Sequence, residues 1–282
     1  MISKVKKIIA AVCSLWILAG MTVFTSCSDD DRHGTVKKSP VVLVHGAWQG
    51  DYAWEEVRNG LVGRGYDVTV VALAGHGADN TPVSGLTFSG YVSQVKLAVT
   101  AFDEPVILVG HSLGGALITQ AAAEIPGKIK KLVYVAGFIP ASGKSVLDYS
   151  MLDPASLLGP VLEFNAEGSL AGLVNPEINF PNVFCQDGTP QQKQFLLEHY
   201  KPEAVAPLAT PLSYQASDYQ SAGSKYYIYT KIDNAISLGF QQQMAADAGI
   251  TATYTIDAGH SPFISKPGEL TAMLSEILIN NK

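Results

Sequence analysis

The stretch VGHSLGG, residues 109–115, places a serine between glycines directly after the apolar run PVILV. Gly110, Ser112 and Gly114 fit the pattern G-x-S-x-G, and the helical stretch ALITQAAAEIP follows. At a sharp turn from strand to helix, this pattern exposes the serine hydroxyl, and side chains at the glycine positions would collide with the neighbouring strand and helix. The motif alone is short enough to occur by chance. Its place between a strand and a helix indicates that Ser112 is a nucleophile rather than a turn residue.

Apolar runs of strand length alternate with helical patterns on both sides of this motif. The runs are PVVLVHG (40–46), YDVTVVALAGHG (66–77), PVILVGHSLGG (105–115), IKKLVYVAGFIP (129–140), SKYYIYTKID (224–233) and TATYTIDAGH (251–260). Such alternation predicts an α/β fold with a mostly parallel central sheet flanked by helices. This alternation of strands and helices stops within residues 141–215, where TPQQKQFLLEHY is the clearest helical pattern. We therefore predict a core made of residues 40–140 and 216–282, with residues 141–215 inserted as a helical cap.

A serine hydroxyl needs a base that removes its proton, and the chain has six histidines. His260 follows the last predicted strand, at the sheet edge where Ser112 lies, and its position makes it the base. The base in turn needs a carboxylate that fixes its tautomer. We favour Asp233, which ends the preceding strand, over Asp257, which lies only three residues before His260. Asp218 stays a competitor, since an acid on an earlier strand would also work geometrically.

Two backbone N–H groups are expected to form an oxyanion hole. One belongs to Leu113, directly after the nucleophile, and the other to Ala47 in the stretch HGAW after the first strand, where Gly46 allows close approach. The sequence contains no H-E-x-x-H motif, and no G-x-G-x-x-G opens a helix after the first strand. We therefore expect neither a metal nor an organic cofactor.

Four stretches resemble a known family: VVLVHGAWQGDYAWEEV, DVTVVALAGHGADNTP, VGHSLGG and YIYTKIDNAISLGFQQQMAADAG with the following DAGHSPFISKPGEL. Together they resemble the plant methylesterase and hydroxynitrile lyase branch of the α/β-hydrolases, with its bacterial carboxylesterase relatives. The resemblance covers roughly residues 40–140 and 224–280. It implies the α/β-hydrolase fold and a triad that falls on Ser112, Asp233 and His260, which supports Asp233 over Asp218.

The resemblance also separates two chemistries. The lyases of this branch typically carry a threonine after the first-loop histidine and a lysine after the catalytic histidine. Here these positions are Gly46 and Ser261, so no obvious cation is present to hold a departing cyanide. Ester hydrolysis is therefore favoured. Tyr52 stands where the family pattern usually shows tryptophan, a change that affects the pocket wall rather than the reaction.

The N-terminus resembles an export signal. Basic MISKVKK precedes the apolar IIAAVCSLWILAGMTVF, and FTSC resembles a loose lipobox whose acylated residue would be Cys27. The following SDDD resembles the acidic export tag of surface lipoproteins. We expect a lipoprotein-type signal peptide at residues 1–26 and a polar tether at residues 27–39, in preference to an uncleaved transmembrane anchor. Cys13 lies in this signal, which leaves Cys185 without a disulfide partner and fit for the interior.

The combined prediction is a serine esterase for small, largely apolar carboxylic esters, exported as a bacterial lipoprotein and held at the cell envelope by its lipid alone. The net charge of −6 argues against a nucleic-acid partner. The sequence gives no oligomeric state. Two alternatives stay open: a lyase that cleaves cyanohydrins, and a non-catalytic surface binding protein on the same fold.

Overall fold

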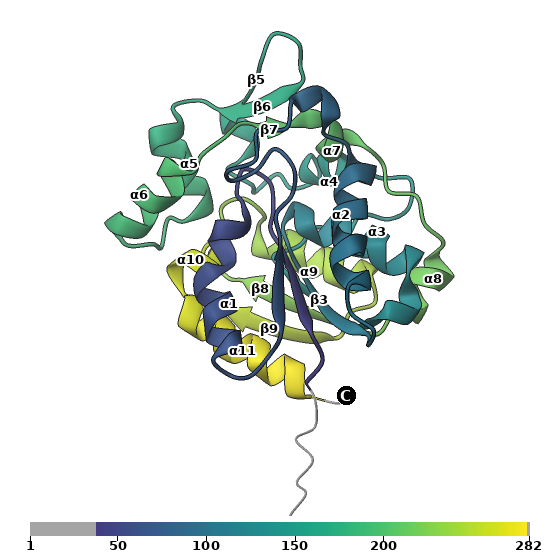
Figure 1. Cartoon of the computed structure of the whole chain (residues 1–282). Helices are drawn as coiled ribbons and strands as arrows, with labels where there is room; N and C mark the ends of the chain where they lie inside the picture. Colours follow the sequence, from purple (N-terminus) through teal and green to yellow (C-terminus); the bar gives the residue numbers. More distant parts are fainter. Residues whose placement is uncertain (1–37, 281–282) are drawn as a thin grey trace, which may run out of the picture. The chain divides into compact units, whose positions relative to one another are not determined.

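The computed structural model describes residues 38–280, and a six-stranded sheet forms its centre (Figure 1). The strands lie in the order β2-β1-β3-β4-β8-β9, and every neighbouring pair is parallel. Their bounds are β1 (Val41–Val44), β2 (Val68–Val71), β3 (Val106–His111), β4 (Ile129–Val135), β8 (Ser224–Thr230) and β9 (Ala252–Ile256). The predicted α/β class with a parallel sheet is confirmed.

Helices cover both faces of this sheet, which explains why its strands β1 and β3 are buried along their whole length. Every residue of β1 and β3 is buried, as expected for parallel strands covered on both sides. On one face, α1 (Glu55–Val62) packs against α11 (Pro267–Ile279); on the other, α3 (Leu113–Glu124) packs against α2 (Phe88–Thr100) and α8 (Ala216–Ser221) (Figure 1). The remaining core helices are α9 (Leu238–Asp247) and the short α10 (Pro262–Ser265).

The strand order reverses between β1 and β3. From β1 the chain moves outward to β2, then returns to the other side of β1 and continues through β3 and β4. In open parallel sheets the crevice at such a reversal, beyond the carboxyl ends of the two strands, is the usual ligand site. Residues that follow β1 and β3 therefore lie at the place where a site is expected.

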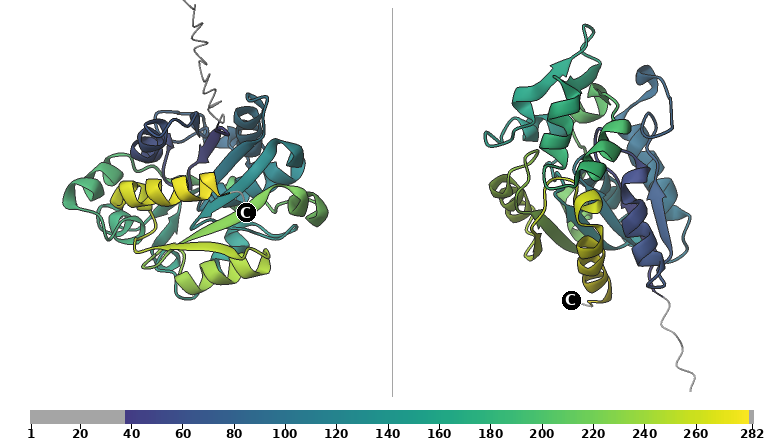
Figure 2. Two further views of the ribbon diagram at one scale, coloured as in Figure 1. Left: turned by 90° about the horizontal axis from the view of Figure 1, so that it is seen from below. Right: turned by 90° about the vertical axis from the view of Figure 1, so that its left-hand side faces the viewer.

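Residues 141–215, hereafter the cap, lie beyond the carboxyl ends of the strands and contain a second sheet (Figures 1 and 2). Its antiparallel strands are β5 (Leu162–Phe164), β6 (Leu170–Leu173) and β7 (Glu203–Ala204); its helices are α4 (Val146–Ser150), α5 (Pro176–Phe184), α6 (Pro190–Glu198) and α7 (Val205–Ala209). The expectation of a helical cap is thus correct for the helices and misses the sheet. These strands are too short to produce a clear alternating pattern.

The predicted signal peptide, Cys27 and nearly all of the predicted tether lie outside the described residues. Within residues 38–280, no helix combines the length and apolar character needed to cross a bilayer.

Candidate active site

Ser112 occupies the turn between β3 and α3 with φ 52° and ψ −123°. A positive φ is costly for a residue with a side chain, and it persists only where the surroundings enforce it. Two glycines make the turn possible. A Cβ atom on Gly110 would lie 2.5 Å from the carbonyl oxygen of Gly114, and one on Gly114 would lie 2.7 Å from that of Val44. The sequence-predicted glycine positions are therefore sites of close backbone contact.

The loop after β1 lies against this turn. A Cβ atom on Gly46 would lie 2.6 Å from the Cβ of Ser112, so only glycine allows the approach. Ala47 and Leu113 both line a cavity together with Ser112. Within residues 38–280, the backbone N–H groups of Ala47 and Leu113 donate no hydrogen bond. Two backbone N–H groups without an acceptor, next to a serine in a strained turn, are the groups that an anion-stabilising site requires.

His45 fixes the peptide group that carries the Ala47 N–H. Its Nε2 accepts a hydrogen bond from the N–H of Leu73 at 3.3 Å, so the ring proton is on Nδ1, which donates to the carbonyl oxygen of Gly46 at 2.9 Å. Burial, together with the nearby charge of His76, lowers the pKa of His45 to about 3. The neutral ring thus holds the Gly46 carbonyl, and the N–H of Ala47 on the same planar peptide points the opposite way.

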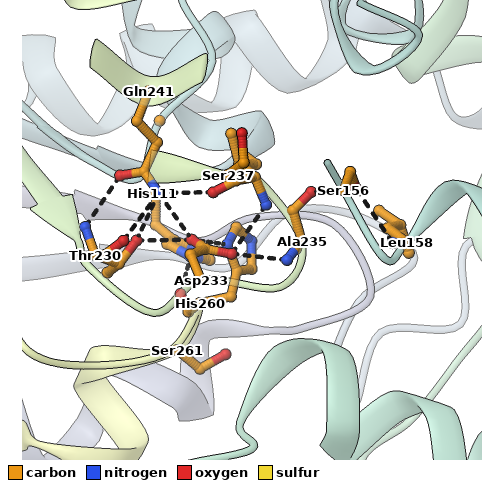
Figure 3. A network of polar contacts seen from close by, with 12 residues as sticks. His111, Ser156, Leu158, Thr230, Asp233, Ala235, Ser237, Gln241, His260 and Ser261 are labelled. Carbon is orange, nitrogen blue, oxygen red and sulfur yellow. Dashed lines mark hydrogen bonds and ion pairs between the residues drawn. The ribbon is translucent and has the colours of Figure 1, made fainter. Parts of the chain in front are cut away.

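His260 and Asp233 meet beside this cavity, although 27 residues separate them (Figure 3). Asp233 follows β8 and His260 follows β9, and β8 and β9 are neighbours. Nδ1 of His260 donates to Oδ2 of Asp233 at 2.8 Å. Nε2 of His260 is buried and has no hydrogen-bond partner in the described part of the chain, and His260 lines the same cavity as Ser112. Because Nδ1 is the donor to Asp233, Nε2 is the ring nitrogen left to act as a base beside the serine.

Asp233 accepts several further hydrogen bonds, which hold its carboxylate rigidly (Figure 3). Oδ1 accepts from the backbone N–H groups of Ala235 and Ile236 at 2.7 and 2.9 Å. Oδ2 accepts from the Thr230 hydroxyl at 2.7 Å and from Nε2 of Gln241 at 3.2 Å. Sequence reasoning missed Thr230 and Gln241, because neither residue belongs to a recognisable motif.

His111, also missed as a site residue, holds the backbone of His260. Its Nε2 donates to the carbonyl oxygen of His260 at 2.8 Å, and the two rings lie 4.5 Å apart. Burial, and then the nearby His260, lowers the pKa of His111 well below its usual value. A neutral His111 therefore links the loop after β9 to the turn that carries Ser112.

The competing acids and bases lie elsewhere. Asp218 is exposed on α8, and Asp257 is exposed and pairs with Lys231 at 3.8 Å. His199 on the cap packs on the Tyr52 ring, with 4.2 Å between ring centroids. His76 is buried and contacts Glu203 of the cap.

The cavity beside Ser112 is almost entirely apolar and contains about 580 Å³ of empty space, including its opening to solvent. Besides Ser112, His260 and the indole of Trp48, the only polar side chain in this lining is that of Ser150, whose hydroxyl donates to the carbonyl oxygen of Leu147. No charged side chain lines it. The apolar lining comes from both core and cap: Ala47, Trp48, Leu113, Phe138, Val146, Leu147, Leu158, Leu162, Phe164, Ala171, Phe184, Val205, Leu208, Ala235 and Ile236.

Cys185 is buried and free, as expected for an interior residue, and burial raises its pKa to about 12. A thiol with so high a pKa is a poor nucleophile at neutral pH. Within residues 38–280, no group of three or more histidine, cysteine, aspartate or glutamate side chains is placed to hold a metal ion.

Comparison with known proteins gives relatives among plant enzymes. The chain is 31% identical over 251 residues to an Arabidopsis thaliana protein named as chloroplastic methylesterase 11, covering 84% of this chain but only 63% of that protein. It is 30% identical to methylesterase 7 of the same plant, over 84% of this chain and 95% of the relative. The alpha-hydroxynitrile lyase of Arabidopsis thaliana is 29% identical, over 86% and 97%.

Solved structures show the same fold at lower identity. A pyrethroid hydrolase from Sphingobium faniae JZ-2 superposes with a TM-score of 0.74 at 23% identity, covering 86% of this chain and 98% of that one. Polyneuridine aldehyde esterase gives 0.74 at 22% identity, covering 85% and 99%. The model of the alpha/beta hydrolase family matches residues 41–273. With this match and the plant relatives, the chain belongs to the α/β-hydrolase family, in its methylesterase branch.

Proposed function

We propose that this chain is a carboxylesterase that hydrolyses small, largely apolar esters, with Ser112 as nucleophile, His260 as general base and Asp233 as its orienting acid. One observation carries the proposal. The His260 ring, held by Asp233 through Nδ1, keeps an unpaired Nε2 in the same apolar cavity as a strained serine. This is the arrangement that acyl transfer needs.

The reaction follows from these groups. Oγ of Ser112 attacks the ester carbonyl carbon while its proton moves to Nε2 of His260. The N–H groups of Ala47 and Leu113 stabilise the negative charge on the carbonyl oxygen. His260 then gives its proton to the leaving alcohol, and an acyl-serine ester remains. Water attacks this ester with His260 again as base, the bond to Oγ breaks, and the acid leaves with Ser112 restored.

The cavity lining supports the substrate class. With apolar side chains on nearly every wall and no charged one, a carboxylate or ammonium on the acyl group would lose its hydration without gaining a partner. Short apolar acyl groups are therefore preferred. The relatives named as methylesterases support cleavage of esters with a small alcohol.

The test is a pre-steady-state experiment with p-nitrophenyl acetate. A burst of p-nitrophenol equal to the enzyme concentration is expected, and Ser112→Ala should abolish it and lower kcat by roughly a thousandfold or more. Rates should then fall steeply as the acyl chain lengthens beyond a few carbons. A folded wild type that releases no p-nitrophenol above the uncatalysed rate would leave the non-catalytic alternative standing.

The lyase alternative has one specific observation in its favour, the 29% identity to alpha-hydroxynitrile lyase. Against it, Ser261 is buried and its hydroxyl accepts a hydrogen bond from Nε2 of Gln49 at 2.7 Å, so no cation occupies this place. Mandelonitrile supplied at the same concentration as the ester separates the two functions. Release of benzaldehyde and cyanide faster than ester hydrolysis would favour the lyase.

We also propose export as a lipoprotein acylated on Cys27. The support is the order of basic, apolar and lipobox-like segments in residues 1–27, which is typical of such signals.

A further inference from the structure

We propose that Glu203, a carboxylate supplied by the cap, positions the loop that carries the Ala47 oxyanion donor. The inference rests on the proposed esterase function and adds a residue outside the triad. Glu203 lies on β7 and is only 2% exposed. Its Oε2 accepts a hydrogen bond from the backbone N–H of Trp48 at 2.9 Å and contacts Nε2 of His76 at 2.8 Å.

Hydrogen-bond geometry and the raised pKa of His76 together support an ion pair between His76 and Glu203. Nδ1 of His76 lies 3.0 Å from the carbonyl oxygen of Ala74, which can only accept, so Nδ1 carries a proton. Nε2 faces a carboxylate oxygen, so it also carries a proton. The His76 ring is therefore an imidazolium, and Glu203 is its buried counter-ion.

The surroundings of His76 are consistent with this charge. The other groups near it are His45, which is neutral, the Tyr91 ring at 5.6 Å between centroids, and Asp79 and Lys201 on the adjoining surface. Burial alone would lower the pKa of His76, but the charge and hydrogen bond of Glu203 outweigh burial, and the pKa is raised.

Trp48 needs external support, because its φ of 58° is unfavourable for a residue other than glycine. The cap supplies that support twice. Glu203 accepts the backbone N–H of Trp48, and the carbonyl oxygen of Ala171 on β6 accepts its indole N–H at 2.9 Å. Both polar hydrogens of Trp48 are thus held by strands of the cap.

Ala47 therefore lies between two fixed peptide groups. On one side His45 holds the Gly46 carbonyl, and on the other side Glu203 holds the Trp48 N–H. Only the φ and ψ angles of Ala47 separate the two groups. Loss of the Glu203 carboxylate frees the Ala47–Trp48 peptide, so Ala47 keeps only the anchor supplied by His45. The position of its N–H relative to the reacting carbonyl is then less well fixed. Displacements of about 1 Å at a catalytic group cost on the order of a hundredfold in rate.

Two variants test this role. Glu203→Ala removes the acceptor of the Trp48 N–H, and we expect kcat for p-nitrophenyl acetate to fall roughly 10- to 100-fold. KM should change by less than about threefold, because Glu203 itself does not line the acyl cavity. Glu203→Gln keeps one acceptor oxygen in nearly the same volume, so a smaller loss of kcat is expected. If Glu203→Ala does not fold, the kcat of Glu203→Gln still tests the role of Glu203.

The matched control is Lys201→Met. Lys201 also joins cap to core, since its Nζ donates to the carbonyl oxygen of Asp79 at 2.9 Å and to Oδ1 of Asn80 at 3.2 Å, but it does not touch the loop of Ala47. Its kcat should stay within about twofold of the wild type. An equal loss of kcat in Lys201→Met and Glu203→Ala would show that cap docking in general is responsible and would overturn the inference.

The rate of labelling by a fluorophosphonate separates this inference from the proposed function. In that reaction Oγ of Ser112 gives its proton to Nε2 of His260 and bonds to phosphorus, fluoride leaves, and the phosphoryl oxygen takes the place of the oxyanion. Wild-type protein that is not labelled contradicts the proposed esterase function itself. Wild-type and Glu203→Ala proteins labelled at the same rate contradict only the role of Glu203; the expected result is slower labelling of the variant, by the same factor as its kcat.

Discussion

Replacing Asp233 with asparagine exchanges one carboxylate oxygen for an amide NH2 group at almost constant volume. The structure decides which oxygen is lost. The backbone N–H groups of Ala235 and Ile236 cannot turn away from Oδ1, so the amide oxygen must face them. The NH2 group then replaces Oδ2 and points at Nδ1 of His260, which donated to that oxygen at 2.8 Å.

Two donors cannot face each other, so the ring proton of His260 moves to Nε2. His260 then has no lone pair for the proton of Ser112, and the general base is lost although every side chain keeps its place. The wrong tautomer of a triad histidine costs about 10⁴ in kcat, or roughly 5.4 kcal/mol of transition-state stabilisation. The Gln241 donor that also faces this position, at 3.2 Å, adds a stability loss on the order of 1–3 kcal/mol.

Stopped-flow hydrolysis of p-nitrophenyl acetate measures kcat, and urea unfolding measures the stability change. Asp218→Asn is the matched control, because Asp218 is exposed on α8 and should leave kcat within about twofold. The reasoning is refuted by a folded Asp233→Asn enzyme that keeps more than about a tenth of the wild-type kcat, or by a larger loss in Asp218→Asn.

Three other predictions follow from particular contacts. Gly46→Ala should lower kcat and destabilise the fold by about 1–3 kcal/mol, because its Cβ would lie 2.6 Å from that of Ser112; kinetics and urea unfolding check both, and an unchanged kcat would contradict the packing. Because the pKa of His76 is raised, the stabilisation from its pair with Glu203 is fully present below about pH 6.5. It is lost as the pH rises through that raised pKa, so the unfolding free energies of wild type and Glu203→Gln should converge at alkaline pH. Cys27→Ser should release the protein from the membrane fraction and abolish labelling by a fatty-acid analogue, whereas wild-type protein that keeps residues 1–26 unlabelled would indicate a spanning anchor.

Much of the fold and of the candidate site was predictable because its signals are local. Buried parallel strands produce continuous apolar runs, so β1 and β3 were evident from composition. The turn at Ser112 requires glycine at positions 110 and 114 for steric reasons that depend on immediate neighbours. Asp233 and His260 follow neighbouring parallel strands. Residues that follow such strands lie close together, because the carboxyl ends of parallel strands point the same way.

What was missed depends on contacts between distant parts of the chain. Glu203 meets Trp48 across 155 residues and lies on a strand of only two residues, so no periodic pattern marks it. Gln241 lies on α9 like its polar neighbours Gln242 and Gln243, and only burial against Thr230 and Asp233 distinguishes it. The sheet of the cap has strands of two to four residues, below the length at which alternation becomes visible.

The common direction of the six strands separates the point where the chain enters the sheet from the cavity beside Ser112. Because all six strands are parallel, their amino ends lie together, and the chain enters β1 there at Val41. The cavity beside Ser112 lies beyond the carboxyl ends of the same strands. The entry of the chain into β1 and the residues around the cavity thus lie at opposite ends of the same strands. A change in the residues just before Val41 therefore leaves the lining of the cavity unaltered, because every lining residue follows Gly46 in the sequence.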